Sequence, residues 1–157
     1  MTPQIGIHEK YQQKVSEILN ILLADQQVLA LKTQNFHWNV KGIHFQQLHE
    51  LFGAQYQALI LQIDELAERI RLLGHYANAS FSEYLRDTRL QESKQQQRSA
   101  KEMLSVLLTD YETVIRAVRQ DLKQVQETGD EGTTDFLIGL IQEHEKTAWF
   151  LRSHLEE

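Results

Sequence analysis

The chain has 157 residues, a formal net charge of −6 at pH 7 and no cysteine. This length fits one domain, expected over residues 1–157, which can bury a core without disulfides. The absence of thiols excludes disulfide frameworks, thiolate metal sites and cysteine catalysis. The acidic balance argues against an intrinsically basic nucleic-acid binder. No apolar signal segment and no apolar run of membrane-spanning length is visible, so the cytoplasm is the expected compartment.

Long helices dominate the predicted secondary structure. The single proline, Pro3, precedes every periodic segment, so nothing after it forbids helix. Apolar residues recur at steps of three and four from Val15 to Phe36, from Leu48 to Leu73, from Ala100 to Val125 and from Leu137 to Leu155. This spacing is typical of amphipathic helices, and no alternating strand pattern competes with it. The sequence therefore predicts an all-α fold.

The connections between these segments predict the topology. Short turns are expected at Lys41-Gly42 and around Thr128 to Thr133, whereas the link from Gly74 to about Ser93 is long and has room for a short helix at Glu83 to Arg89. The second helix should be about 45 Å long, and about 20 linker residues can reach back along it. Two hairpins joined by one long crossover make a ferritin-like four-helix bundle. The alternative is an up-down bundle with a loose central loop.

Two carboxylates on the second predicted helix are candidates for metal chemistry. Asp64 and Glu68 are spaced i,i+4, so they project from the same helix face. The neighbouring Arg69 and Arg71 offer a simpler explanation, in which the acids form ordinary surface ion pairs. Taken alone, the carboxylates favour this simpler interpretation.

Two histidines strengthen the case for a metal site. His37 lies five residues before Gly42 and His49 lies seven after it, so an antiparallel hairpin places them roughly level. Two imidazoles on adjacent helices provide half of a nitrogen and oxygen ligand set. The alternative is a pair of buried histidines that only pack and hydrogen-bond in the core.

The histidines and carboxylates cannot meet within one chain. His49 and Asp64 are 15 positions apart on one predicted helix, which corresponds to about 22 Å of helical rise, whereas metal ligands lie about 2 Å from the ion. A joint site therefore requires a second copy, with the second helix packed antiparallel against itself. A two-fold axis near Gln57 and Ala58 would create two identical sites.

Several motifs resemble the Dps family of mini-ferritins, and the similarity extends from about His8 to Glu157. The residues that carry it are Asn35-Phe36-His37-Trp38-Asn39-Val40-Lys41-Gly42, Leu48-His49-Glu50-Leu51-Phe52, Asp64-Glu65-Leu66-Ala67-Glu68-Arg69-Ile70 and Glu143-His144-Glu145-Lys146-Thr147-Ala148-Trp149-Phe150-Leu151-Arg152. The resemblance implies a hollow shell of twelve subunits that oxidises Fe(II), typically with hydrogen peroxide, and stores the ferric mineral. It also implies ferroxidase sites at two-fold interfaces.

The resemblance assigns roles to individual residues. His37 and His49 of one subunit, with Asp64 and Glu68 of its neighbour, are implied as the iron ligands, and Glu68 as the firmest of them. Such a mixed set suits Fe(II), although Zn(II) or Mn(II) can compete for it. Trp38 is either a one-electron donor near this site or a large aromatic residue that fills the core.

Gly53 departs from the family pattern, which usually has a carboxylate four residues after the second histidine. Glycine supplies no ligand and weakens a helix by about 1 kcal/mol relative to alanine. The second iron position is therefore in doubt, and it would rely on His49 and water or bind only weakly. Substitution of the missing ligand by Glu50 or His44 is disfavoured. Alternatively, Gly53 lets two helices approach closely at the dimer interface.

Asp130 and Asp135 open the last predicted helix. Family members have acidic pores at three-fold axes near this segment, so the resemblance implies that these residues attract incoming iron. Capping of the helix and compensation of its dipole also explain acids at this position, and the two interpretations are compatible. His144 lies on the apolar stripe of that helix and is expected to be a core histidine.

DNA binding is the weaker hypothesis for this sequence. Some Dps members compact DNA through a long lysine-rich tail, whereas here Lys10 and Lys14 fall near or inside the first helix and the chain ends in Glu156 and Glu157. Phosphate binding requires clustered positive charge, which is not visible. The leading hypothesis is a homo-oligomeric ferroxidase that uses peroxide or oxygen. The alternative is a nucleoid-associated shell that protects DNA physically.

Overall fold

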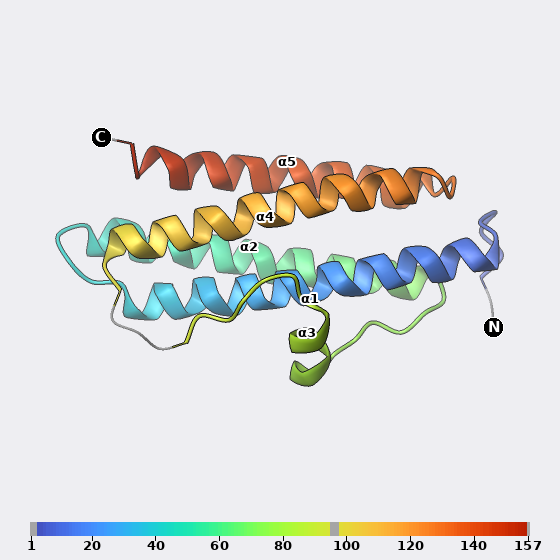
Figure 1. Cartoon of the computed structure of the whole chain (residues 1–157), viewed down its shortest axis with the longest axis horizontal. Helices are drawn as coiled ribbons and strands as arrows, with labels where there is room; N and C mark the ends of the chain where they lie inside the picture. The colour runs from blue at the N-terminus through green and yellow to red at the C-terminus, as the bar shows by residue number, and fades with distance from the viewer. Residues whose placement is uncertain (1–2, 95–97, 157) are drawn as a thin grey trace.

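The computed structural model describes residues 3–94 and 98–156, so both ends of the domain predicted at 1–157 lie outside the described residues. These residues form five helices: α1 (Glu9–Asn39), α2 (Phe45–Leu72), α3 (Phe81–Asp87), α4 (Ala100–Gln126) and α5 (Glu131–Ser153). Figure 1 shows two antiparallel hairpins, α1–α2 and α4–α5, with the crossover and α3 passing along the outside of α1. The all-α ferritin-like arrangement predicted from the sequence is confirmed.

Local signals account for the helix ends. Gly42 adopts φ +117° in the α1–α2 turn, and Gly129 adopts φ +74° in the α4–α5 turn; both conformations are accessible to glycine at little cost. Ser99 and Glu102 form a reciprocal capping box at the start of α4. The short crossover helix begins at Phe81 rather than at the predicted Glu83, because Ser80 caps it by accepting a hydrogen bond from the Glu83 amide.

The core lies between the two hairpins. The apolar stripes of the four long helices are buried, and Phe36, Phe52, Leu107 and Tyr111 are among the largest side chains with almost no solvent contact. Burial of one such side chain contributes about 1.5–3 kcal/mol. These buried stripes pack the four long helices against one another.

A buried ion-pair network fastens the crossover to the bundle. Asp25 of α1 is fully buried and accepts hydrogen bonds from the Arg89 side chain at 2.7 Å and the Arg89 amide at 2.6 Å. The same guanidinium donates to Asp121 of α4 at 2.9 Å. One arginine on the crossover therefore ties α1 to α4, which contradicts the alternative of a loose central loop. No helix in the described ranges is long and apolar enough to cross a membrane.

Candidate metal centre

The closed end of the α1–α2 hairpin brings two histidines together. His37 lies in the last turn of α1, and His49 lies near the start of α2. Their imidazole rings stack with centroids 3.8 Å apart and an angle of 19° between the planes. The prediction that these positions lie level across the turn is confirmed.

Backbone carbonyls orient both rings. His37 Nδ1 lies 2.7 Å from the His49 carbonyl oxygen, and His49 Nδ1 lies 2.8 Å from the His37 carbonyl oxygen. A carbonyl oxygen can only accept, so each Nδ1 carries the hydrogen and donates it. In the neutral rings the Nε2 atoms therefore keep their lone pairs. Such a bond to Nδ1 is how proteins commonly orient a metal-binding histidine.

Gly53 of α2 makes room for the His37 ring. A Cβ atom at position 53 would lie 3.0 Å from His37 Cε1 and 3.1 Å from His37 Nδ1. Gly53 is buried within the chain itself. The close approach that this glycine allows therefore lies inside the hairpin, which corrects the expectation that it serves the dimer interface.

The two candidate carboxylates are exposed on α2 and are not neutralised by their neighbours. The side chains of Asp64 and Glu68 form no ion pair or hydrogen bond with another described residue. Arg69 instead donates to Asp130 at 2.8 Å and to Thr133 at 2.8 Å. Arg71 donates to the His75 carbonyl oxygen. The surface ion-pair interpretation of Asp64 and Glu68 is therefore wrong.

The two candidate half-sites lie apart within one chain. Helical rise separates His49 from Asp64 by about 22 Å. Among the residues that the structure describes, no three histidine or acidic side chains come close enough to hold a metal ion together. Neither Glu50 nor His44 therefore completes a cluster of three with the histidine pair.

Comparisons with known proteins place the chain in a family. Residues 16–157 match the family model for the ferritin-like domain. DNA protection during starvation protein 2 of Bacillus anthracis is 39% identical over 92% of this chain and 98% of its own length. The DPS protein of Vibrio cholerae O1, described as a member of a superfamily of ferritin-like diiron-carboxylate proteins, is 36% identical with a TM-score of 0.94, over 99% of this chain and 97% of that one.

This chain belongs to the Dps family. An uncharacterized low temperature-induced protein of Nostoc sp. is a further relative, with 40% identity over 97% of this chain and 86% of its own length. Among solved structures, Dps from Staphylococcus aureus is 31% identical with a TM-score of 0.89, over 93% of this chain and 97% of that one. The whole of the described helical bundle is thus a Dps fold.

Trp38 lies outside the bundle of this Dps protein. Its side chain is 63% exposed, so the expectation that it fills the core is wrong. Each residue of a helix is turned by about 100° from the one before, which carries Trp38 away from the side occupied by His37. Within the described residues, no ring contact joins Trp38 to either histidine of the pair.

Tyr56 is a neighbour of the site that the sequence analysis missed. Its ring packs against His37 with centroids 5.3 Å apart, and Phe45 stacks on His49 at 5.2 Å. Tyr56 follows Gly53 by three positions and His49 by seven, spacings that share one helix face. That spacing could have pointed to it in the sequence.

Asp130 caps the start of α5 in this Dps chain. Its buried carboxylate accepts hydrogen bonds from the Thr133 amide at 2.9 Å and from Arg69 at 2.8 Å. The capping interpretation is confirmed for Asp130. Asp135 is exposed. The two acids that the sequence grouped as a path for iron thus differ in their environments, and their role in uptake stays a prediction.

His144 is the core histidine that the sequence predicted. It is 1% exposed, and its Nε2 lies 2.6 Å from the amide nitrogen of Gln26. Burial lowers its pKa from 6.5 to about 4, because the charged ring would lose its hydration. His144 is therefore neutral at pH 7 and packs edge-on against Tyr111.

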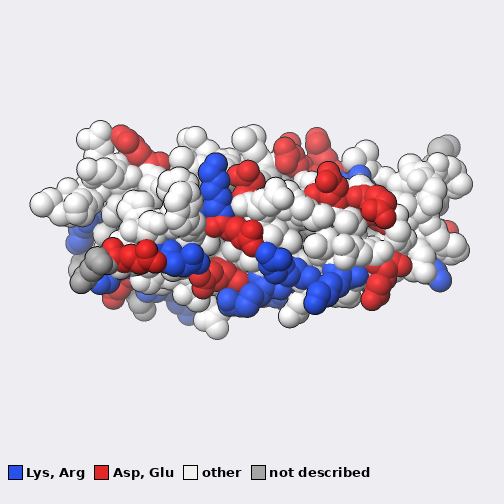
Figure 2. Space-filling view, turned by 90° about the horizontal axis from the view of Figure 1, so that it is seen from above, with Lys and Arg blue, Asp and Glu red and all other residues white. Residues whose placement is uncertain are grey.

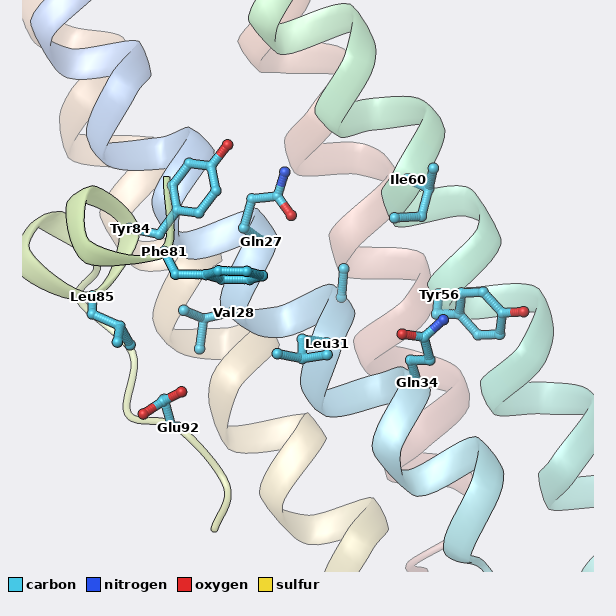
Figure 3. A pocket seen from close by; sticks show the side chains of 11 residues that line it. Gln27, Val28, Leu31, Gln34, Tyr56, Ile60, Phe81, Tyr84, Leu85 and Glu92 are labelled. Atoms are coloured by element: carbon cyan, nitrogen blue, oxygen red, sulfur yellow. The ribbon is translucent and has the colours of Figure 1, made fainter. Parts of the chain in front are cut away.

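An apolar pocket lies beside the candidate metal centre, between α1, α2 and α3 (Figure 3), with a volume of about 220 Å³. Leu31, Tyr56, Ile60, Phe81 and Leu85 form part of its lining. Glu92 is the one acid among the lining residues, so the pocket lacks the donors of a metal site. Phe81 is 79% exposed and Leu85 49% exposed, so this side of α3 presents apolar side chains that the described residues leave largely uncovered.

Proposed function

We propose that this protein is a cytoplasmic ferroxidase that oxidises Fe(II), stores the ferric product in a hollow homo-oligomeric shell and so protects against peroxide. Each reacting site is shared, with His37 and His49 from one subunit and Asp64 and Glu68 from its neighbour. One observation carries the proposal. An oriented histidine pair, at the end of α1 and the start of α2, lies too far from two exposed α2 carboxylates, unpaired among the described residues, for the four to act together within one chain.

A two-fold contact between α2 helices would join the half-sites. An axis near Gln57 and Ala58 brings the histidines of each chain to the carboxylates of the other, twice. Between the half-sites, α2 exposes Ala54, Ala58 and Leu61, the last of them 67% exposed. These side chains are small or apolar, and burial against their symmetry copies would stabilise the contact. The apolar side of α3 extends the same surface, and the family resemblance extends the dimer to a shell of twelve subunits.

The assembled ligand set suits Fe(II) as a substrate. Two imidazole nitrogens and two carboxylates are donors that bind Fe(II), and Zn(II) or Mn(II) compete for them. Coordination positions left open by the protein would admit hydrogen peroxide, the preferred oxidant, or oxygen. Two Fe(II) ions and two protons convert one peroxide into two water molecules without release of hydroxyl radical. Because Gly53 supplies no carboxylate, the second iron would depend on His49 and water and would bind weakly.

Iron uptake is a second step that acidic residues would assist. Asp135 is exposed near the start of α5, whereas the Asp130 carboxylate is occupied by Arg69 and Thr133. We expect Asp135 to contribute more of the field that attracts Fe(II), and Asp130 to position the turn. Negative potential at an opening raises the local concentration of cations and the rate of their arrival.

A DNA-protecting shell remains the alternative, because relatives from Bacillus anthracis and Helicobacter pylori carry names for DNA protection during starvation. The surface argues against strong DNA binding. Figure 2 shows Lys and Arg interspersed with Asp and Glu over the α4–α5 side, and Arg152 pairs with Glu112 there at 2.8 Å. Gel shifts at two salt concentrations separate the hypotheses, since phosphate binding falls steeply with salt.

A mixing experiment tests the shared site. The variants His37→Ala/His49→Ala and Asp64→Ala/Glu68→Ala should each be inactive when assembled alone. After joint disassembly and reassembly, half of the dimers are mixed and one of their two sites is intact, so about a quarter of the wild-type rate should return. Ferric absorbance after Fe(II) addition, first with oxygen and then with peroxide, measures the rate.

Each variant carried alone through the same reassembly is the control. A mixture that stays inactive although mixed dimers form would show that the site is not shared. Wild-type activity in either variant alone would place the site elsewhere.

A further inference from the structure

We propose that Tyr56 is a one-electron donor for peroxide reduction, in place of Trp38. This inference rests on the proposed ferroxidase function. At an interface that holds a single iron, Fe(II) and the Tyr56 phenol would each supply one electron to peroxide. Tyr56 thereby takes the place of the missing second iron.

The position of Tyr56 is the first argument. Its ring contacts the His37 ring at a centroid distance of 5.3 Å and an angle of 59°. The carbonyl bond at Nδ1 leaves His37 Nε2 as the ligand atom, so Tyr56 packs directly on an iron ligand. In Figure 3, Tyr56 extends from α2 beside Gln34 of α1, with its hydroxyl directed away from the α3 side of the pocket.

Gly53 is the second argument, because it affects both the position of the His37 ring and the ligands available to a second iron. The absence of a side chain at position 53 lets the His37 ring rest on α2, one turn before Tyr56 on the same face. The same absence removes the carboxylate that would hold a second iron. The residue that weakens the second iron position thus also seats His37 on the helix that carries Tyr56.

Among the described residues, Trp38 makes no ring contact with the histidine pair, unlike Tyr56. Trp38 is largely exposed and borders a different pocket, together with Asn35 and Ser93. Tyr56 is half-buried and contacts the ligand ring, so a radical on its ring would be shielded inside the hairpin.

The electron count of the reaction is balanced. Peroxide requires two electrons for cleavage of its O–O bond, and one Fe(II) supplies one. The Tyr56 phenol supplies the second electron together with its proton. Fe(II), hydrogen peroxide and the phenol yield Fe(III), a tyrosyl radical, one water and one hydroxide. A further Fe(II) and a proton then return the radical to the phenol, with a second Fe(III) as the product.

Freeze-quenched electron paramagnetic resonance tests this inference. The assembled protein is loaded with one Fe(II) per site and mixed with hydrogen peroxide. The wild type should give a radical signal whose hyperfine pattern narrows when the protein contains ring-deuterated tyrosine. Tyr56→Phe should lose the signal, because phenylalanine keeps the packing on His37 and removes the phenol. Trp38→Phe, and Tyr76→Phe at a tyrosine that is 84% exposed, should retain it.

Spin trapping gives a second readout. With one Fe(II) per site, Tyr56→Phe should release several-fold more hydroxyl radical than the wild type, because the second electron is missing. Fast iron oxidation without a tyrosine signal in the wild type would overturn the inference and leave the ferroxidase function intact. Loss of the signal in Trp38→Phe but not in Tyr56→Phe would overturn it as well. Absence of any iron oxidation in the wild type would overturn both proposals.

Discussion

His144 and the His37–His49 pair both lie between packed amphipathic helices, yet their ring nitrogens are used differently. At His144, deep in the bundle, Nε2 contacts Gln26. At His37 and His49, backbone carbonyls take Nδ1 and leave Nε2 without a hydrogen-bond partner among the described residues. The comparison teaches that a histidine becomes available to a metal through the nitrogen that the surroundings leave open.

Depth of burial adds to this difference. His144 is almost fully buried, and desolvation lowers its pKa to about 4. His37 and His49 are half-buried at the closed end of the hairpin, next to the α2 surface that we propose as an interface. One environment therefore serves the core, and the other leaves a ring nitrogen, the proposed ligand atom, where a second chain could reach it.

The largest effect should come from removal of a ligand. We expect Glu68→Ala and His37→Ala each to slow iron oxidation by at least about 100-fold, more than the loss of an outer-shell residue usually costs. Helical content should remain, because Glu68 is exposed and makes no contact that the fold needs. Rapid-mixing absorbance measures the rate. Glu65→Ala, an exposed acid on the same helix, should oxidise iron normally, and equal losses in Glu65→Ala and Glu68→Ala would contradict the assignment.

The core histidine should affect stability and not chemistry. Unfolded His144 takes up a proton below pH 6.5, whereas the folded residue does so only below about pH 4. The unfolded state therefore binds more protons in this window, and stability falls as the pH decreases through it. The protonation of His144 in the unfolded state should therefore lower the free energy of unfolding by about 2 kcal/mol between pH 7 and pH 5.

Denaturant unfolding at the two pH values measures that change. His144→Gln keeps a polar partner for Gln26 but cannot titrate in this range, so it should lose that part of the acid sensitivity. Iron oxidation at pH 7 should be unchanged. A slower rate in this variant would mean that the two histidine environments are not independent.

A substitution at Gly53 should disturb the histidine pair, because the His37 ring lies against this glycine. Gly53→Ala places a methyl group 3.0 Å from His37 Cε1, so the ring must shift and iron affinity should fall by about tenfold. Gly139→Ala is the matched control, because no atom lies within 4 Å of its added Cβ. It should stabilise α5 by up to about 1 kcal/mol and leave iron binding unchanged. Titration calorimetry on both variants decides whether the contact at Gly53 positions His37.

The smallest effect concerns the two acids near the start of α5. Asp135→Asn should slow iron uptake a few-fold at low salt, and the difference should vanish at high salt because exposed charges are screened. Asp130→Asn should mainly lower stability, by about 1–3 kcal/mol, because Arg69 loses its charged partner. Uptake kinetics at two ionic strengths and thermal unfolding separate the roles. Identical behaviour of both variants would contradict this division.

Local information in the sequence was sufficient for the fold and for the relative positions of the candidate ligands. Apolar spacing of three and four specifies helices, and Gly42 specifies the turn, because these effects act over neighbouring residues. The level position of His37 and His49, and the separation of His49 from Asp64, follow from the constant rise of a helix. The sequence motifs around these residues indicated the Dps family.

Tertiary packing decided which atoms of those residues are available. Arg69 could pair with Glu68 or with a distant acid, and the fold placed Asp130 beside it. The carbonyl contacts of His37 and His49, and the space that Gly53 provides, exist only after α1 docks on α2. The exposure of Trp38 and the contact of Tyr56 with His37 also arise from this packing. Side-chain partners are chosen among residues far apart in sequence, and packing of the whole bundle determines which of them meet.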